Sequence, residues 1–232
     1  MIIKSIFFNF LFYFSIAFFG ILFLPLLFSE KLTRKGVKFW AILIIFLLRK
    51  IIGVKIIYQN QYIFKKRGYL LAANHQSVFD TIFFLKEFDK VIYIVKKELK
   101  YIPIYGWYAS RLGNIFVDRN KRIESIKHIS ENVCRVLKMN YKVIIFPEGT
   151  RQLEKKIGKI KPGIFILQKF CKSLVYPVYI NSYCVWPKND FIKKSKSIKV
   201  KVLAPLEYEE SKMKFICKLK NCLEVENKKN NL

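Results

Sequence analysis

The first part of the chain is a continuous apolar run. Residues 5–29 contain no charged side chain and are rich in Phe, Leu and Ile. This run is longer than the roughly 20 residues that an α-helix needs to cross a bilayer. A cleaved signal peptide fits less well, because the run outlasts a signal-peptide core and no small-x-small cleavage motif follows before Glu30. We therefore expect a helix that spans or enters the membrane deeply.

A second apolar stretch, residues 39–48, is bracketed by Lys38 and by Arg49 and Lys50. It is short for a membrane span. Basic residues at both ends favour an element in the membrane interface, with the cationic heads reaching lipid phosphates. An ordinary core helix is the alternative.

The rest of the chain alternates between short apolar runs typical of strands and longer segments with the 3.6-residue period of a helix. Short β-branched or aromatic runs predict strands at 54–58, 69–73, 91–95, 142–146, 174–180 and 198–203, and helical patterns lie at 78–88, 122–139 and 163–171. This alternation predicts an α/β fold with a mixed, largely parallel sheet flanked by helices. We expect a membrane-anchoring helix pair over residues 1–52, one domain over residues 53–223, and a frayed basic tail over residues 224–232.

Charge and composition narrow the classes of partner. The 232 residues carry a formal net charge of +27, yet 53% are hydrophobic and the mean hydropathy is +0.18, which excludes a disordered polycation. Many aromatic residues lie in the first apolar run, and no nucleic-acid-binding signature is present, so a basic nucleic-acid binder is the remote alternative. We expect anionic membrane lipids as partners and no nucleic acid.

Cysteine and histidine usage bears on compartment and metals. The five cysteines are odd in number and form no C-x-x-C pair, and there are two histidines, His75 and His128. We therefore expect no disulfide framework and no metal site, in a reducing compartment. Basic residues after the first run outnumber the lone Lys4 before it, which favours a cytoplasmic location for the domain.

The motif NHQSVFD, residues 74–80, follows the second predicted strand. If the chain turns between His75 and Asp80, the carboxylate can hold the imidazole in the tautomer whose other nitrogen accepts a proton. That pair would be a general base with its orienting acid. Because no nucleophile elbow is evident, direct attack by a substrate hydroxyl is the economical chemistry. The alternative is a capping box, in which Ser77 and Asp80 only cap a helix.

The motif FPEGTR, residues 146–151, follows another predicted strand and suits an anion. Gly149 permits close approach of the backbone, and the guanidinium of Arg151 matches a phosphate. Arg119, in the segment GNIFVDR, could supply a second guanidinium. A salt bridge is the alternative for each arginine, for instance Arg119 with Asp118 or Glu148.

Together these motifs give a resemblance. NHQSVFD, GNIFVDR and FPEGTR, followed by Pro177-Val178, resemble the 1-acylglycerol-3-phosphate acyltransferase family, also called the lysophosphatidic acid acyltransferase or PlsC-type family. KKELKYIPIYGW at 96–107, the KPG at 161–163 and NSYCVWP at 181–187 are similar to that family as well. The likeness covers approximately residues 54–206.

The resemblance implies a function and roles for residues. The expected reaction is acyl transfer from acyl-acyl carrier protein or acyl-CoA to the sn-2 hydroxyl of lysophosphatidic acid, giving phosphatidic acid. His75 would be the base and Asp80 its partner. The residues expected to hold or shape the site for the glycerol phosphate are Arg119, Glu148, Gly149, Thr150 and Arg151, and the candidates for supporting roles are Asn74, Ser77, Lys97 and Lys161. Another lysophospholipid or glycerol-3-phosphate is the alternative acceptor. No cofactor is expected beside the acyl thioester, which is a co-substrate. The apolar segment 101–112 could line a groove for the acyl chain, or it could pack against the sheet. The expected location is the cytoplasmic face of a bacterial inner membrane.

Overall fold

The protein was analysed as a computed structural model that describes residues 1–60, 67–118, 123–153 and 156–230. In that part of the chain, the centre is a seven-stranded sheet with the order β1-β7-β6-β2-β5-β3-β4. The strands are β1 (Lys55–Gln59), β2 (Tyr69–Ala73), β3 (Val91–Lys96), β4 (Ile115–Val117), β5 (Lys142–Ile145), β6 (Val175–Ile180) and β7 (Ser197–Val202). All neighbours pair in parallel except β6 and β7. The predicted mixed, largely parallel sheet is confirmed.

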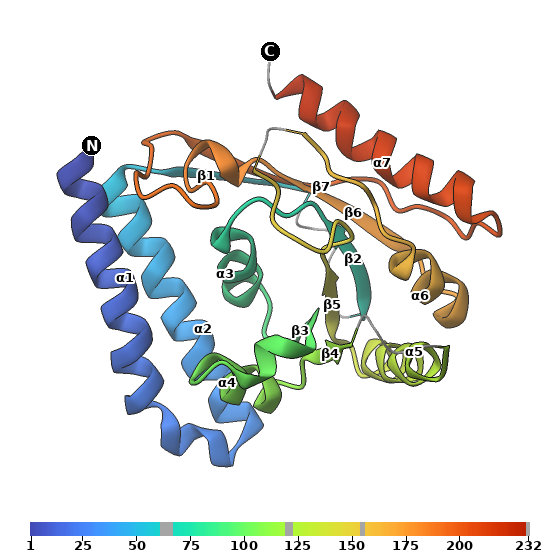
Figure 1. Ribbon diagram of the computed structural model, residues 1–232, viewed down its shortest axis with the longest axis horizontal. Coiled ribbons are helices and arrows are strands. Elements are labelled where there is room, and N and C mark those ends of the chain that lie inside the picture. The colour runs from blue at the N-terminus through green and yellow to red at the C-terminus, as the bar shows by residue number, and fades with distance from the viewer. Residues whose placement is uncertain (61–66, 119–122, 154–155, 231–232) are drawn as a thin grey trace.

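Helices cover both faces of this sheet (Figure 1). The α-helices are α1 (Ile2–Leu22), α2 (Glu30–Leu47), α3 (Val78–Glu87), α4 (Tyr105–Arg111), α5 (Ile123–Lys138), α6 (Gly163–Cys171) and α7 (Lys212–Lys229). Shorter helical segments are η1 (Leu24–Phe28), η2 (Leu48–Ile52), η4 (Lys97–Tyr101) and η5 (Ser182–Cys184).

The alternation along β2 explains the two layers. Leu70 and Ala72 are fully buried in a core with residues of α5, α6 and α7. Leu71 and Ala73 are equally buried, but in the opposite core, which includes α2 and α3. Successive side chains of a strand point to opposite faces, so a strand without polar residues requires cover on both sides.

The N-terminal helix pair α1–α2 packs along one side of the domain (Figure 1). α1 is the one helix of the described chain that is long and apolar enough to cross a membrane, judged by length and composition. Its polar residues Ser5, Asn9 and Ser15 are buried: the backbone N–H of Lys193 donates to Ser5 Oγ at 2.9 Å, and Asn9 Nδ2 donates to the carbonyl of Phe191 at 2.9 Å. The opposite side of α1 exposes aromatic and aliphatic side chains.

The second apolar stretch belongs to a longer helix than its pattern indicated. α2 begins at Glu30, where Ser29 caps it, and runs into η2. Ala41, Ile44 and Ile45 are buried, as in a core helix, whereas Ile42 and Phe46 are exposed. The stretch therefore has features of both a core helix and an interfacial element, because one face lies in the core and the other is exposed.

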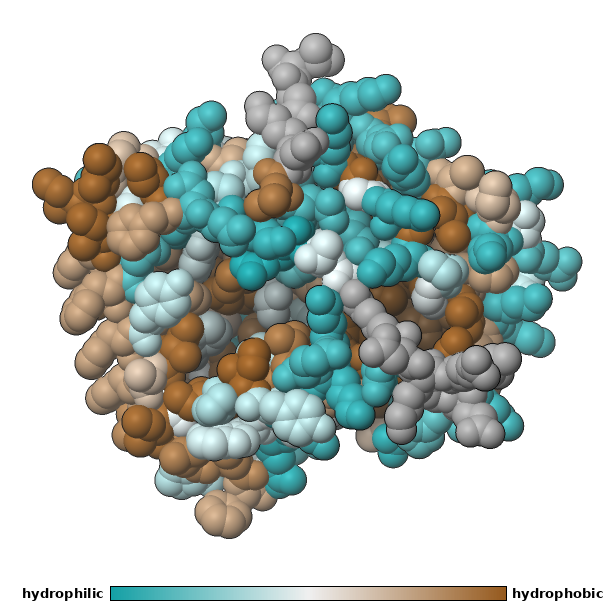
Figure 2. Space-filling view, viewed as in Figure 1, coloured by the Kyte–Doolittle hydropathy of each residue, from teal (hydrophilic) through white to brown (hydrophobic). Residues whose placement is uncertain are grey.

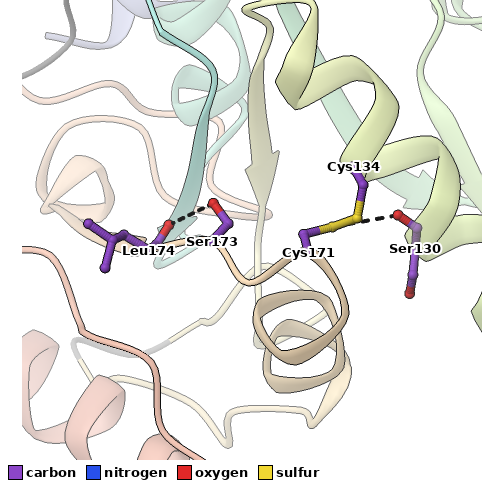
Figure 3. Close-up of a disulfide and its surroundings, with 5 residues drawn as sticks. All are labelled: Ser130, Cys134, Cys171, Ser173 and Leu174. Carbon is purple, nitrogen blue, oxygen red and sulfur yellow. Dashed lines mark hydrogen bonds between the residues drawn. A yellow bond between two sulfur atoms is a disulfide. The ribbon is translucent and has the colours of Figure 1, made fainter.

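The structure corrects three expectations. Residues 224–229 are not a frayed tail, because α7 continues to Lys229 and buries Glu226 and Asn227. The segment 115–117 is an edge strand, β4, which its short apolar run did not predict. Cys134 on α5 and Cys171 at the end of α6 form a disulfide, so the expectation of no disulfide is wrong (Figure 3). The packing of α5 against α6 joins these cysteines, which sequence spacing cannot reveal.

Candidate active site

Three neighbouring parallel strands end at the same edge of the sheet. β2 lies between β6 and β5, with Ala73 opposite Val178 and Ala72 opposite Ile145. The loop after β2 carries the NHQSVFD motif, the loop after β5 carries FPEGTR, and η5 follows β6. Ligand sites of open α/β sheets lie beyond the carboxyl ends of the strands. The topology therefore brings both motifs to one place.

His75 and Asp80 are in contact. His75 Nδ1 lies 2.9 Å from Asp80 Oδ2, and the same oxygen accepts the backbone N–H of Gln76 at 2.7 Å and of Ser77 at 2.9 Å. Ser77 is the N-cap of α3, and its hydroxyl accepts the N–H of Phe79 at 3.1 Å. The capping box and the His75–Asp80 pair therefore coexist, because the loop turns between the two residues.

A third residue, from the short helix η5 after β6, contacts this pair. Ser182, fully buried in η5, donates its hydroxyl to Asp80 Oδ1. Asn74 fixes the start of the loop, because its side chain donates to the carbonyl of Ile180 at 2.8 Å and accepts the N–H of Ile180 at 2.7 Å. The role of Ser182 was missed by sequence reasoning, and the only signal was its place in NSYCVWP.

An aromatic ring supports the imidazole. Phe146, the first residue after β5, stacks on His75 with ring centroids 3.9 Å apart and an interplanar angle of 14°. Tyr93 of β3 lies on the Phe146 ring at 6.3 Å and 16°. The His75 side chain keeps 16% of its surface exposed, whereas Asp80 has none. The stack and Asp80 thus fix the ring while one part of it stays accessible. The sequence showed Phe146 but gave it no role.

Glu148 links the two motifs through their backbones. Its Oε2 accepts the N–H of His75 at 3.0 Å and its Oε1 accepts the N–H of Gly158 at 3.0 Å. The N–H of Gln152 in turn donates to the carbonyl of His75 at 2.8 Å. Burial raises the pKa of Glu148 to about 7, although the hydrogen bonds from Gly158 and His75 oppose this rise. The buried carboxyl group of Glu148 therefore holds the backbones of His75 and Gly158 in position.

The rest of FPEGTR forms a tight turn. Gly149 has φ +73°, a left-handed conformation that favours glycine, and its N–H donates to the carbonyl of Phe146 at 2.9 Å. Thr150 is exposed and its carbonyl accepts from Gln152 Nε2 at 3.1 Å. Arg151 is half-buried beside these groups, and within the described chain no carboxylate forms a salt bridge with its guanidinium.

The remaining candidates lie near this edge or outside the described residues. Lys97, directly after β3, forms a salt bridge of 3.2 Å with Asp118, directly after β4. Lys161 is exposed, and its N–H donates to the carbonyl of Pro147 at 2.9 Å. Arg119 lies outside the described residues. Over the described ranges, no group of three or more metal-ligating side chains is close enough to hold an ion.

Two known enzymes are similar to this chain in sequence. Over 186 residues the chain is 28% identical to 1-acyl-sn-glycerol-3-phosphate acyltransferase of Pseudomonas aeruginosa, covering 80% of this chain and 72% of that protein. A protein of the same name from Saccharomyces cerevisiae is 33% identical over 149 residues, which cover 62% of this chain and about half (49%) of the yeast protein.

A solved structure has the same fold. The crystal structure of the 1-acyl-sn-glycerophosphate (LPA) acyltransferase PlsC from Thermotoga maritima matches with a TM-score of 0.80 at 21% identity, covering 99% of this chain and 95% of that chain. The Acyltransferase family matches residues 55–181, from the start of β1 to the residue after β6, and this range contains His75, Asp80 and FPEGTR. The chain therefore belongs to the Acyltransferase family.

Proposed function

We propose that this protein transfers a fatty acyl group from acyl-acyl carrier protein or acyl-CoA to the sn-2 hydroxyl of 1-acylglycerol-3-phosphate, giving phosphatidic acid. Relatives that bear the name of this activity support the proposal, as do the motifs NHQSVFD and FPEGTR in the sequence. The observation that carries it is the His75–Asp80 pair, 2.9 Å apart, tied by hydrogen bonds to the FPEGTR loop.

The contacts of His75 suit a general base. An imidazole that donates Nδ1–H to Asp80 keeps the lone pair of Nε2 for a substrate proton. His75 would take the proton of the acceptor hydroxyl while its oxygen attacks the thioester carbonyl. When the tetrahedral intermediate collapses, the C–S bond breaks and the imidazolium returns the proton to the thiolate. The products are the ester and a free thiol, and the positioned base contributes about 10² to 10⁴ in rate.

A phosphate-binding role for the neighbouring loop follows from charge. Arg151 is one residue before Gln152, whose N–H donates to the carbonyl of His75. A guanidinium at that place can bind the phosphate of the acceptor while the hydroxyl lies near the imidazole. We assign Arg119 the second guanidinium, and Glu148 and Gly149 the shaping of the loop.

The exposed side of α1 suits a lipid environment, because its aromatic and aliphatic side chains have no cover in the described chain. We propose that α1 and α2 hold the protein on the membrane that contains its acceptor, at the cytoplasmic face of a bacterial inner membrane. The number and spacing of the cysteines no longer support the cytoplasmic face, because Cys134 and Cys171 form a disulfide and disulfides persist in oxidising compartments. The positive-inside distribution remains its support.

The test is an acyl-transfer assay of the full chain in vesicles. Labelled acyl-acyl carrier protein or acyl-CoA is offered with lysophosphatidic acid, glycerol-3-phosphate or lysophosphatidylcholine, and products are identified by mass. We expect phosphatidic acid from lysophosphatidic acid. Acylation of only one of the other acceptors would overturn the assigned substrate, and no acylation with either donor would overturn the reaction.

Three variants make the assay specific to the site. His75→Ala should lower kcat by about 10² to 10⁴. Arg151→Ala should mainly raise KM for the phosphorylated acceptor, by about tenfold or more. Arg135→Ala, an exposed arginine of α5, is the matched control and should retain wild-type values. An unchanged KM in Arg151→Ala would contradict the phosphate-binding role.

A further inference from the structure

The segment from Lys96 to Arg111, which contains η4 and α4, exposes large apolar and aromatic side chains. Tyr101 is 73% exposed, Trp107 51% and Ile102 46%. The opposite side of α4 is buried through Gly106, Tyr108 and Ala109. The segment is therefore anchored by one face and presents an aromatic face outward, which neither an acyl-chain groove nor packing against the sheet accounts for.

A strained turn holds this face in place. Ile104 has φ 64° and ψ −65°, and the N–H of Tyr105 donates to the carbonyl of Pro103 at 2.7 Å, which defines a γ-turn. A β-branched residue with positive φ is an outlier that the surrounding structure must stabilise. The backbone of Gly106 also packs closely against Lys100, since a Cβ on Gly106 would lie 1.9 Å from the carbonyl oxygen of Lys100.

The stabilising contacts come from α1. The side chain of Ile104 lies over Gly20, so that a Cβ on Gly20 would come within 2.6 Å of Ile104 Cγ2. Tyr108 donates its hydroxyl to the carbonyl of Gly20 at 3.0 Å. The exposed residues Phe18 and Ile21 are close neighbours of Gly20 on the same helix. The aromatic face of η4 and α4 is therefore continuous with the apolar face of α1.

Figure 2 shows hydrophobic residues along the left side over α1 and around its lower end, with residues of intermediate hydropathy beside them. Basic residues accompany the aromatic ones: the segment contains Lys96, Lys97, Lys100 and Arg111, against the single acidic residue Glu98. Lys96, Lys100 and Arg111 are exposed. Tyr and Trp beside Lys and Arg is the composition of proteins at the interface of an anionic bilayer.

We propose that the segment from Lys96 to Arg111 is a second membrane-contacting element, which inserts Tyr101, Tyr105 and Trp107 into the interface of an anionic bilayer. It begins at the last residue of β3, and β3 pairs with β5, which is followed by Phe146 stacked on His75. Under the proposed function, this element would hold the catalytic edge against the lipid that contains the acceptor. The membrane contact itself does not depend on the reaction.

The experiment measures quenching of tryptophan fluorescence by vesicle lipids. The full chain is reconstituted with phosphatidylglycerol and a phosphatidylcholine that is brominated near the headgroup end of its acyl chains. The protein has three tryptophans, of which Trp40 and Trp186 are less exposed than Trp107. We expect strong quenching that Trp107→Phe largely removes. Equal quenching in wild type and Trp107→Phe would overturn the proposal.

A matched pair of variants locates the contact. In the Trp107→Phe protein, Tyr101→Trp should restore quenching, whereas Tyr208→Trp, at an exposed tyrosine before α7, should not. Quenching at both positions, or at neither, would contradict the assignment. A detergent-solubilised dimer that Tyr101→Ser dissociates would instead identify the face as a protein interface. Since no readout uses catalysis, loss of the proposed reaction and loss of this contact are distinguishable.

Discussion

At the residue scale, Asp80 combines a structural and a proposed chemical role in one carboxylate. Its oxygens accept from two backbone N–H groups at the start of α3, from Ser182 and from His75. The helix cap holds the carboxylate still, and a fixed carboxylate holds the imidazole in one orientation. The helix cap therefore also orients the proposed base, and the capping box and the His75–Asp80 pair are both present.

Substitution of Asp80 separates these roles. Asp80→Asn keeps an oxygen for the helix cap but loses a negative partner for His75, so kcat should fall about 10²- to 10⁴-fold while α3 remains folded. Ser182→Ala removes one donor to Asp80 and should lower kcat about three- to tenfold. Acyl-transfer kinetics and circular dichroism measure both. An Asp80→Asn protein within threefold of wild type would contradict the orienting role.

Glu148 gives the fold a specific dependence on pH. Burial raises its pKa from 4.5 to about 7 in the folded protein. Between these values the folded state binds more protons than the unfolded state, so the free energy of unfolding falls as pH rises. Relative to Glu148→Gln, wild type should lose up to about 3 kcal/mol between pH 4.5 and pH 7, and no more above that range.

The comparison of wild type with Glu148→Gln removes the contributions of other titrating groups. Urea unfolding at pH 5 and pH 8 in the same detergent measures the difference. A difference that is independent of pH, or one that favours wild type as pH rises, would show that Glu148 is not a buried carboxyl with a raised pKa. The variant should also lose activity, because a carboxamide cannot accept both N–H groups of His75 and Gly158 through two oxygens.

At the element scale, the disulfide joins two helices on the side of the sheet opposite α3 (Figure 3). Cys134 lies in the last part of α5 and Cys171 ends α6, with Cα atoms 5.2 Å apart and a separation of 37 positions in sequence. Their loop contains β5 and FPEGTR. The bond therefore constrains the segment that supplies Phe146 and Glu148.

Loss of this bond should destabilise the protein without changing its chemistry. Cross-linking a loop of this length lowers the entropy of the unfolded chain and contributes about 2 to 4 kcal/mol. Cys134→Ser, or reduction of wild type, should lower the melting temperature, and Cys134→Ser should not respond to a reductant. Cys217→Ser, at an exposed free cysteine, is the matched control. A reductant that leaves the wild-type melting temperature unchanged would contradict the bond.

At the scale of the whole molecule, Arg34 connects the helix pair to the domain. Its guanidinium donates to the carbonyl of Val91 at the start of β3 at 3.0 Å and to the carbonyl of Leu112 after α4. Glu30 pairs with it at 2.9 Å, and the ring of Tyr141 lies 4.8 Å away. These contacts of Arg34 therefore hold α2 in a defined position against the sheet.

Removal of this connection should lower stability more than loss of an exposed charge. Arg34→Met leaves two carbonyls without their donor and should reduce the free energy of unfolding by about 2 to 4 kcal/mol. Lys35→Met, at an exposed position next in sequence, should change it by less than about 0.5 kcal/mol. Urea unfolding in detergent measures both. Equal effects of the two substitutions would contradict the connecting role of Arg34.

The sequence by itself determined the N-terminal helix pair, the strands other than β4 and the helices α3, α5 and α6, because a period of two or of 3.6 in hydrophobicity is a local property of the chain. It did not predict α4 or α7. The sequence also placed His75 and FPEGTR in loops after strands, since each follows a predicted strand, and Asp80 in the first turn of the helix that follows His75. β4 was missed because its three residues are too few to show a period.

Only the tertiary structure decided which distant residues meet. The pairing of β2 with β5 and β6 brings Phe146 and Ser182 to the His75–Asp80 pair. The packing of α5 on α6 joins Cys134 to Cys171. These contacts depend on the order of strands in the sheet and on helix packing, which combine segments far apart in the chain and leave no periodic signal in any one of them.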